Sequence, residues 1–348
     1  MSDPIILDEE TLSERPLTGE AAAREAGRWR RRGFKADTSD LSLHSPIRAT
    51  LILLCYLLFT LILIPVQMIL LKLHSGWAVR LPMFYHRCVC WLFGLEIVVR
   101  GKAETAHPTL FVGNHTSYID IEVLSALIPV SFIAKAEVAR WPLFGTLARL
   151  QRTVFVDRRP QSTGDQRDEI ASRLAAGDDL ILFPEGTSDD GNRTLPFYSA
   201  LLSVAEQRLP DGSPVPVQPV SIGYSELNGF PIGRSLRPLL AWYGDMELAP
   251  HLWCFAGLGR VKIVVEFHRT VTIDQFTSRK ALTQYCRQAI ARGMADAISG
   301  RWSDSQDQQA HGGESQAEAN GAKGLANMPG ANIAGANIPG ANIPGKPA

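Results

Sequence analysis

The chain has 348 residues, of which 45% are hydrophobic and 20% charged, so it is long and apolar enough to bury a sizeable core. Lysine plus arginine and aspartate plus glutamate both total 35, and the resulting formal net charge of zero argues against a protein that binds nucleic acid. The five cysteines fit neither a disulfide framework nor a zinc site, so we expect reduced thiols and no bound metal.

Residues 1–46 are polar and rich in charge. We interpret this segment as a disordered tail, with a short helix at EAAAREAGRWRRRGFK as the alternative.

The stretch ATLILLCYLLFTLILIPVQMILL, residues 49–71, contains no charged residue. A helix of about 23 residues is ~35 Å long, which is enough to cross a hydrocarbon core of ~30 Å. A buried core helix is the alternative, but core helices rarely stay apolar on every face for this length. We therefore expect a membrane helix that Pro65 kinks or splits into two segments.

The next stretch, WAVRLPMFYHRCVCWLFGLEIVVRG, is also apolar but contains many aromatic residues and is interrupted by Arg80, His86 and Arg87. This mixture predicts an interfacial helix, so residues 47–100 form the expected membrane anchor. Counting the basic residues around 49–71 places the N-terminus in the cytoplasm and the remainder outside. A helical hairpin would instead keep both ends in the cytoplasm, and this is the topology we prefer.

From residue 101 to 300, short apolar segments alternate with amphipathic ones, which favours one α/β domain with a central, mostly parallel sheet flanked by helices. In such folds, functional residues collect in the loops after the carboxyl ends of strands. Strands are predicted at 109–114, 130–137, 153–158, 179–187, 215–224 and 261–273. Helices are predicted at 117–128, 141–151, 162–177 (with Gly177 as its C-cap), 196–207 and 276–298.

The tail from residue 301 carries the tandem repeats ANMPG, ANIAG, ANIPG and ANIPG from Ala326. Proline and glycine at this density oppose a packed core, so we predict disorder, with a short solenoid of five-residue repeats as the alternative.

The heptapeptide NHTSYID, residues 114–120, follows a predicted strand and allows two interpretations. Ser117 and Asp120 have the spacing of a helix-capping box with aspartate in place of glutamate. Alternatively, His115 is a general base, because a neutral imidazole titrates near ~6.5 and can take the proton of a hydroxyl, while Asp120 orients the ring. Five helical residues turn through about 500°, so the two side chains can meet only if His115 precedes the helix.

Three more segments follow in order: FVDRR at 155–159, FPEGTSDDG at 183–191 and VPVQPVSIGY at 215–224. Together with His-x4-Asp, they resemble the four motifs of the glycerolipid acyltransferases of the lysophosphatidate-acyltransferase type. In that family the other motifs are a strand ending in Phe-Val-Asp-Arg, the sequence Phe-Pro-Glu-Gly-Thr, and an apolar strand with a proline, here Pro219. The resemblance covers about residues 80–300, and the four motifs in order are far more specific than His-x4-Asp alone.

The resemblance implies that His115 deprotonates the hydroxyl of an acyl acceptor and that Asp120 orients His115. It also implies that Arg158 binds the acceptor head group, in a bidentate manner if that group is a phosphate. Three further residues are expected to shape the acceptor site: Glu185, Gly186 and Thr187. The expected supporting residues are Asn114, Ser117, Phe183, Pro184, Arg159 and Arg193.

The expected protein is therefore a membrane-bound O-acyltransferase without a cofactor, whose co-substrate is acyl-CoA or acyl-carrier protein. The acceptor is a lysolipid, first of all 1-acyl-sn-glycerol-3-phosphate, which would give phosphatidate. The other expected partner of the protein is the lipid bilayer. Because the thioester donors are cytoplasmic, we expect the cytoplasmic face of the inner membrane.

Two departures from the family pattern concern the acceptor. Ser188 stands where the family often has arginine, and Tyr198 where it often has lysine. Both changes remove cations, while Asp189 and Asp190 add negative charge, so a cationic acceptor such as lyso-ornithine lipid is the alternative. Arg159 or Arg193 could supply the missing positive charge for a phosphate.

Rival classes fit the sequence less well. A hydrolase would be expected to carry a Gly-x-Ser-x-Gly elbow, which this sequence lacks. The segment AGLGRVK, residues 256–262, lacks the third glycine of a dinucleotide-binding loop and precedes a predicted strand rather than a helix. A catalytically silent membrane scaffold with the same fold remains as a rival of another class, although the intact motifs argue against it.

Overall fold

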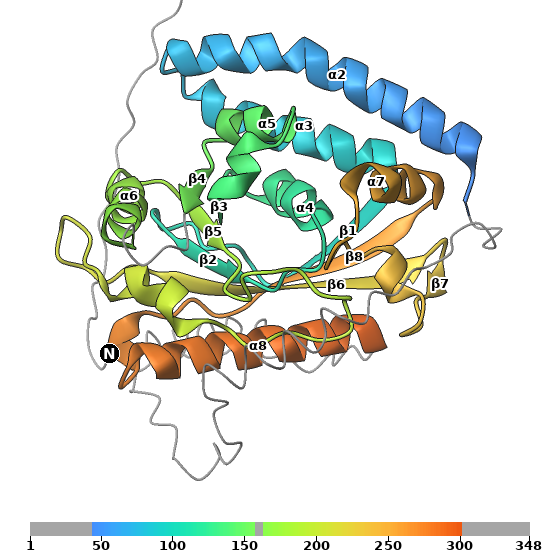
Figure 1. Cartoon of the computed structure of the whole chain (residues 1–348). Helices are drawn as coiled ribbons and strands as arrows, with labels where there is room; N and C mark the ends of the chain where they lie inside the picture. The colour runs from blue at the N-terminus through green and yellow to red at the C-terminus, as the bar shows by residue number, and fades with distance from the viewer. Residues whose placement is uncertain (1–43, 157–162, 301–348) are drawn as a thin grey trace, which may run out of the picture. The chain divides into compact units, whose positions relative to one another are not determined.

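The computed structural model of the chain describes residues 44–156 and 163–300. Most of the predicted N-terminal tail and all of the predicted C-terminal repeats lie outside the described residues. The mixed α/β fold predicted from the sequence is confirmed (Figure 1).

A central sheet has the strand order β1-β8-β6-β2-β5-β3-β4, with β7 beside β6. All neighbouring strands are parallel except β6 with β8 and β6 with β7, so the mostly parallel sheet is confirmed. The strands are β1 (Leu95–Arg100), β2 (Leu110–Gly113), β3 (Ser131–Lys135), β4 (Val154–Val156), β5 (Leu180–Leu182), β6 (Val217–Leu227), β7 (Phe230–Pro231) and β8 (Val261–Phe267).

Helices cover both faces of the sheet (Figure 1): α8 packs on one face, and α3, α4 and α7 lie over the other, beneath α2. The α-helices are α2 (Pro46–Lys72), α3 (Trp77–Phe93), α4 (Ile119–Leu127), α5 (Phe144–Leu150), α6 (Thr163–Ala175), α7 (Leu248–Gly257) and α8 (Arg279–Ser299). The short 3₁₀ helices are η3 (Ala136–Arg140), η5 (Ser199–Glu206), η6 (Arg237–Leu239) and η7 (Ile273–Gln275).

The central strands are buried on both faces, which explains their unbroken apolar runs. In β2, Phe111 belongs to the cluster under α3 and α4, whereas Leu110 and Val112 belong to the cluster under α6 and α8. Because successive side chains of a strand point to opposite faces, β2 contributes to both cores at once.

The apolar stretch forms one long helix, α2, and α3 returns beneath it as the second arm of a hairpin. The rings of Tyr56 and Phe93 meet edge-on at 5.7 Å, and the Thr60 and Tyr85 hydroxyls lie 2.8 Å apart. Pro65 lies inside α2, which runs unbroken past it, so the predicted alternative of two separate segments is wrong. The structure does not test on which side of a membrane the two ends lie.

Side chains near both ends of α2 attach this helix to the domain. The Arg48 guanidinium donates to the carbonyl oxygens of Phe93 (2.9 Å) and Gly259 (3.2 Å) and also contacts that of Ala256. Near the other end, Gln67 Nε2 donates to the carbonyl oxygens of Ala78 (2.8 Å) and Leu150 (3.0 Å). The helix therefore lies along the domain (Figure 1).

Three segments differ from the sequence predictions. Residues 95–100, assigned to the anchor, form the edge strand β1, which pairs with β8. The helix predicted at 196–207 is the 3₁₀ helix η5, which buries Leu202, Val204 and Ala205. The strand predicted at 261–273 ends at Phe267, and α7 was not predicted as a separate helix.

Candidate active site

The first and third sequence motifs meet because β2 and β5 are parallel neighbours. Their carboxyl ends lie at the same edge of the sheet, so the loops that begin at Asn114 and Phe183 run side by side. The Phe183 ring stacks on the His115 ring with centroids 4.3 Å apart and planes 11° apart. Gly113 allows this approach, since a Cβ atom there would lie 3.2 Å from the Phe183 ring.

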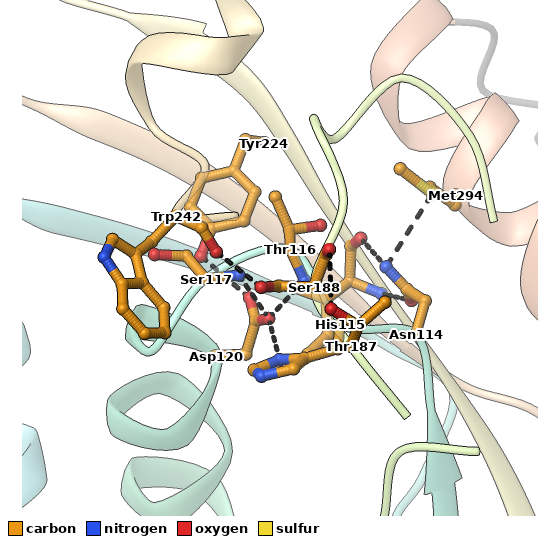
Figure 2. A network of polar contacts seen from close by, with 11 residues as sticks. Asn114, His115, Thr116, Ser117, Asp120, Thr187, Ser188, Tyr224, Trp242 and Met294 are labelled. Atoms are coloured by element: carbon orange, nitrogen blue, oxygen red, sulfur yellow. Dashed lines mark hydrogen bonds and ion pairs between the residues drawn. The ribbon is translucent and has the colours of Figure 1, made fainter. Parts of the chain in front are cut away.

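His115 lies in the turn before α4, as it must if its side chain is to meet that of Asp120 five residues later. Its Nδ1 atom is 2.9 Å from Asp120 Oδ2 (Figure 2). Because an ionised carboxylate only accepts hydrogen bonds, Nδ1 carries the proton and Nε2 is the basic nitrogen of the neutral ring. Within the described residues Nε2 has no hydrogen-bond partner, and the His115 side chain is 19% exposed.

Asp120 is fully buried and acts both as a cap and as a partner of the histidine. Its Oδ2 atom also accepts the backbone N–H groups of Thr116 (2.7 Å) and Ser117 (2.9 Å), while Tyr224 donates to Oδ1 at 2.8 Å. The Ser117 hydroxyl has no partner among the described residues, so the predicted capping box is only half formed. Both interpretations of NHTSYID thus apply to the same carboxylate.

Glu185 is buried beside this pair, at 2% exposure. Burial, reinforced by the nearby carboxylates of Asp189 and Asp120, raises the pKa of Glu185 well above its ordinary value, and the backbone amides of Leu195 and His115 only partly oppose this. The raised pKa favours the neutral carboxylic acid, which can donate one hydrogen bond. Gly186 follows with a positive φ of 66°, which turns the loop back over the site.

The two aspartates after this motif lie at the rim of the site. The Asp189 backbone N–H donates to the His115 carbonyl oxygen at 3.2 Å, and its carboxylate pairs with Arg193 at 3.2 Å. The Ser188 hydroxyl donates to the Trp242 carbonyl oxygen at 2.5 Å, which fixes the loop. Burial, with Asp190 and Asp189 next in effect, raises the pKa of Tyr243, so negative potential extends to this side of the site.

The supporting residues hold the site together in different ways. Asn114 extends the sheet, because its amide donates to the Ile222 carbonyl oxygen (2.9 Å) and accepts the Ile222 N–H (2.8 Å). The Pro184 carbonyl oxygen accepts the Tyr198 N–H at 2.9 Å. Thr187 is exposed and makes only a long contact to the Ser188 carbonyl oxygen, at 3.4 Å.

Arg158, predicted to bind the acceptor head group, and Arg159, predicted as a supporting residue, lie outside the described residues. Their roles stay predictions. In residues 44–156 and 163–300, no cluster of three histidine, cysteine, aspartate or glutamate side chains could hold a metal ion.

An apolar cavity of about 190 Å³, open on one side, lies next to the site, and α2, α3, α4 and α5 contribute most of its lining. Phe132 connects the two, since it lines the cavity and stacks on Phe183 at 6.2 Å, and Phe183 in turn covers His115. On the other side, Tyr118 lines the cavity and contacts the Trp242 ring edge-on at 6.1 Å.

Sequence reasoning missed two contributors to the site. Tyr224 ends the predicted strand at 215–224, and only its inward position on β6 would have suggested that it reaches Asp120. Trp242 lies on a loop without any motif, and its backbone N–H donates to the Thr116 carbonyl oxygen at 3.1 Å.

Fold and site together define an acyltransferase of the His-x4-Asp type, and comparison with known proteins agrees. A family model described as Acyltransferase matches residues 96–223. The chain is 46% identical over 258 residues to the lyso-ornithine lipid O-acyltransferase of Brucella abortus, covering 73% of this chain and 97% of that protein. The chain therefore belongs to the acyltransferase family and is an acyltransferase enzyme.

Two further relatives extend the comparison. The chain is 30% identical over 206 residues to the 1-acyl-sn-glycerol-3-phosphate acyltransferase of Neisseria gonorrhoeae, covering 58% of this chain and 75% of that protein. The crystal structure of the 1-acyl-sn-glycerophosphate acyltransferase PlsC from Thermotoga maritima matches with a TM-score of 0.54 at 21% identity, covering 74% of this chain and 98% of that one. This last match supports the fold alone.

Proposed function

We propose that the protein transfers an acyl group from a thioester, acyl-CoA or acyl-carrier protein, to the free hydroxyl of a lysolipid. His115 Nε2 takes the proton of the acceptor hydroxyl as its oxygen attacks the thioester carbonyl carbon. The tetrahedral intermediate then collapses, the carbon–sulfur bond breaks, and the proton passes from His115 to the leaving thiolate. An ester and a thiol are the products.

The observation that carries this proposal is the buried Asp120 carboxylate at Nδ1 of a partly exposed His115. An imidazole held in this tautomer presents its basic nitrogen to a substrate, and the carboxylate stabilises the imidazolium that forms. The acceptor supplies the hydroxyl, so the enzyme needs no nucleophile of its own.

For the acceptor we favour lyso-ornithine lipid over lysophosphatidate. Four relatives at 35–46% identity carry the name lyso-ornithine lipid O-acyltransferase. Asp189, whose amide donates to the His115 carbonyl oxygen, forms an ion pair with Arg193. Together with Asp190, its carboxylate would attract a cationic head group and repel a phosphate. The Neisseria relatives at 30% identity keep lysophosphatidate as the second candidate.

The apolar cavity beside Phe132 supports a place for an acyl chain, because an alkyl chain gains ~0.8 kcal/mol for each methylene removed from water.

We also infer that α2 lies within one leaflet of a membrane on the cytoplasmic face, where the thioester donors are. The helix is apolar and long enough to cross a membrane, yet its ends are attached to the domain through Arg48 and Gln67. Its outward side carries large exposed apolar residues, including Leu51, Leu54, Leu58, Leu61, Ile62 and Ile69.

The acceptor assignment is tested by offering the purified protein lyso-ornithine lipid and lysophosphatidate in competition. The wild type should prefer lyso-ornithine lipid, and Asp189→Asn should lower that preference about tenfold or more, since a hydrogen bond to a charged group is worth ~1.5–3 kcal/mol. Asp211→Asn, on an exposed turn, is the matched control and should change nothing. A wild type that prefers lysophosphatidate would overturn the assignment.

A further inference from the structure

The loop that follows the Phe-Pro-Glu-Gly-Thr motif carries charged side chains of both signs. The Arg193 Nε atom donates to Asp189 Oδ2 at 3.2 Å. Asn192 joins Asp190 to Arg237, because its backbone N–H and its Nδ2 atom donate to the two Asp190 oxygens at 3.0 Å, and its Oδ1 atom accepts from Arg237 Nη1 at 2.6 Å. Within this hydrogen-bonded set, which we call the rim cluster, two carboxylates balance two guanidinium groups.

The charged members of the rim cluster differ in exposure. Arg237 is buried, so it fixes the loop rather than facing a substrate. Arg234 joins the loop through its carbonyl oxygen, and its exposed side chain is screened by solvent. The side chains of Asp189 and Arg193 are 15% and 40% exposed. Because the Asp189 amide donates to the His115 carbonyl oxygen, a lysolipid whose hydroxyl lies at His115 brings its head group to this ion pair.

The rim cluster suits a head group that itself carries both signs of charge. A phosphate at Arg193 would also meet the carboxylates of Asp189 and Asp190, whose repulsion offsets the attraction. A head group with an ammonium alone would compete with Arg193 for Asp189 and leave the guanidinium without its partner. Burial raises the pKa of Asp189, and the Asp190 carboxylate adds to this effect, so an ammonium bound between them would favour the ionised form.

We propose that Arg193 is a specificity-determining residue that binds the carboxylate of an amino-acid head group, while Asp189 and Asp190 bind its ammonium group. A guanidinium presents planar donors that match the two oxygens of a carboxylate. Ornithine linked through one of its two nitrogens keeps both a carboxylate and an amine. This inference rests on the acceptor proposed above, and it adds the carboxylate as a group that the enzyme recognises.

The test is a binding assay with the full-length protein in detergent and four amides of palmitic acid, which lack the hydroxyl that would be acylated. Nα-palmitoylornithine carries both charges, N-palmitoylputrescine the ammonium alone, N-palmitoylnorvaline the carboxylate alone, and N-palmitoylbutylamine neither. The ornithine amide should bind about tenfold more tightly than either singly charged amide, because each of these loses a hydrogen bond between charged groups. If either singly charged amide binds as tightly as the ornithine amide, the proposal is wrong.

Protein variants assign the carboxylate preference to a residue. Arg193→Gln should abolish the preference for the ornithine amide over the putrescine amide, and Arg193→Lys, which keeps the charge, should retain part of it. Arg208→Gln removes an arginine from an exposed ion pair with Asp274 and is the matched control, which should keep the full preference. A carboxylate preference that survives Arg193→Gln would overturn the role of Arg193. If Arg193→Gln does not fold, the four amides on the wild type and Arg193→Lys decide.

The binding assay separates this inference from the proposed reaction, because the amides bind without reacting. A protein that transfers acyl groups to lyso-ornithine lipid but binds the ornithine and putrescine amides equally would refute the carboxylate site alone. A protein that prefers the ornithine amide but transfers nothing would refute the proposed reaction and support the carboxylate site.

Discussion

At the scale of single residues, the proposed catalysis depends on the fully buried carboxylate of Asp120. It accepts two backbone amides, the His115 ring and the Tyr224 hydroxyl, so it both closes the first turn of α4 and fixes the histidine tautomer. The five-residue spacing allowed the contact with His115, and the other three motifs of the family resemblance were needed to prefer it over a helix cap. Tyr224 could not be predicted, because its approach depends on how β6 pairs with β2.

Asp120→Asn should therefore lower kcat/KM for acyl transfer by about 10²–10⁴-fold, since an amide at this position no longer enforces the productive tautomer. Tyr224→Phe is a graded comparison, because it removes one neutral donor to Asp120 and should cost about tenfold. Equal losses in the two variants would contradict the role given to the carboxylate.

Glu185 leads to a prediction about pH and stability. Its folded-state pKa is raised above the ordinary 4.5, so the free energy of unfolding should fall as pH rises through that value and continue to fall up to the folded pKa. Glu185→Gln does not titrate and should raise the melting temperature, by a margin that grows as the pH rises above 4.5 towards the folded-state pKa of Glu185. A tenfold difference in proton affinity between the folded and unfolded chain corresponds to about 1.4 kcal/mol. If the difference in melting temperature between Glu185→Gln and the wild type does not change with pH, burial does not raise the pKa of Glu185.

At the scale of elements, apolar runs and turn residues predicted most strands and helices of the domain. The exceptions have local causes. Pro65 does not break α2, because the helix is held to the domain at both ends. The segment at 196–207 forms a 3₁₀ helix rather than an α-helix, and its apolar pattern does not distinguish the two, because Leu202, Val204 and Ala205 all join the same core.

Arg48 offers a test of how α2 is attached. Arg48→Ala removes its hydrogen bonds to the Phe93, Gly259 and Ala256 carbonyls and should lower the free energy of unfolding by about 2 kcal/mol. Arg80→Ala removes the same charge from an exposed position on α3 and is the control. Equal melting temperatures for the two variants in detergent would show that α2 does not depend on this contact.

At the scale of the whole molecule, the sequence predicted a membrane segment and an α/β domain. It could not predict how the two are joined, because hydrogen bonds such as that from Gln67 to Leu150 link residues 83 positions apart. The cavity has a similar origin, since its lining combines residues of α2, α3, α4 and α5 with Leu248 of α7. Arg158 remains a prediction drawn from the motif.

If the outer side of α2 lies in a leaflet, charges placed there should weaken membrane binding. Leu58→Glu with Ile62→Glu should lower partitioning into phospholipid vesicles more than tenfold, because each side chain contributes ~1.5–3 kcal/mol when buried. Gln284→Glu with Gln288→Glu adds the same charge to the exposed side of α8 and should have little effect. Equal partitioning of both double variants would contradict the proposed orientation.

The most direct test of the central claim is transfer of a labelled acyl group from acyl-CoA or acyl-carrier protein to lyso-ornithine lipid by membranes containing the protein, with His115→Ala in parallel. The account predicts a labelled ester product whose rate of formation falls about 10²–10⁴-fold in the variant. Transfer that does not depend on His115 would contradict the general-base mechanism. Absence of transfer to either lyso-ornithine lipid or lysophosphatidate, by a protein shown to be folded, would contradict the proposed function.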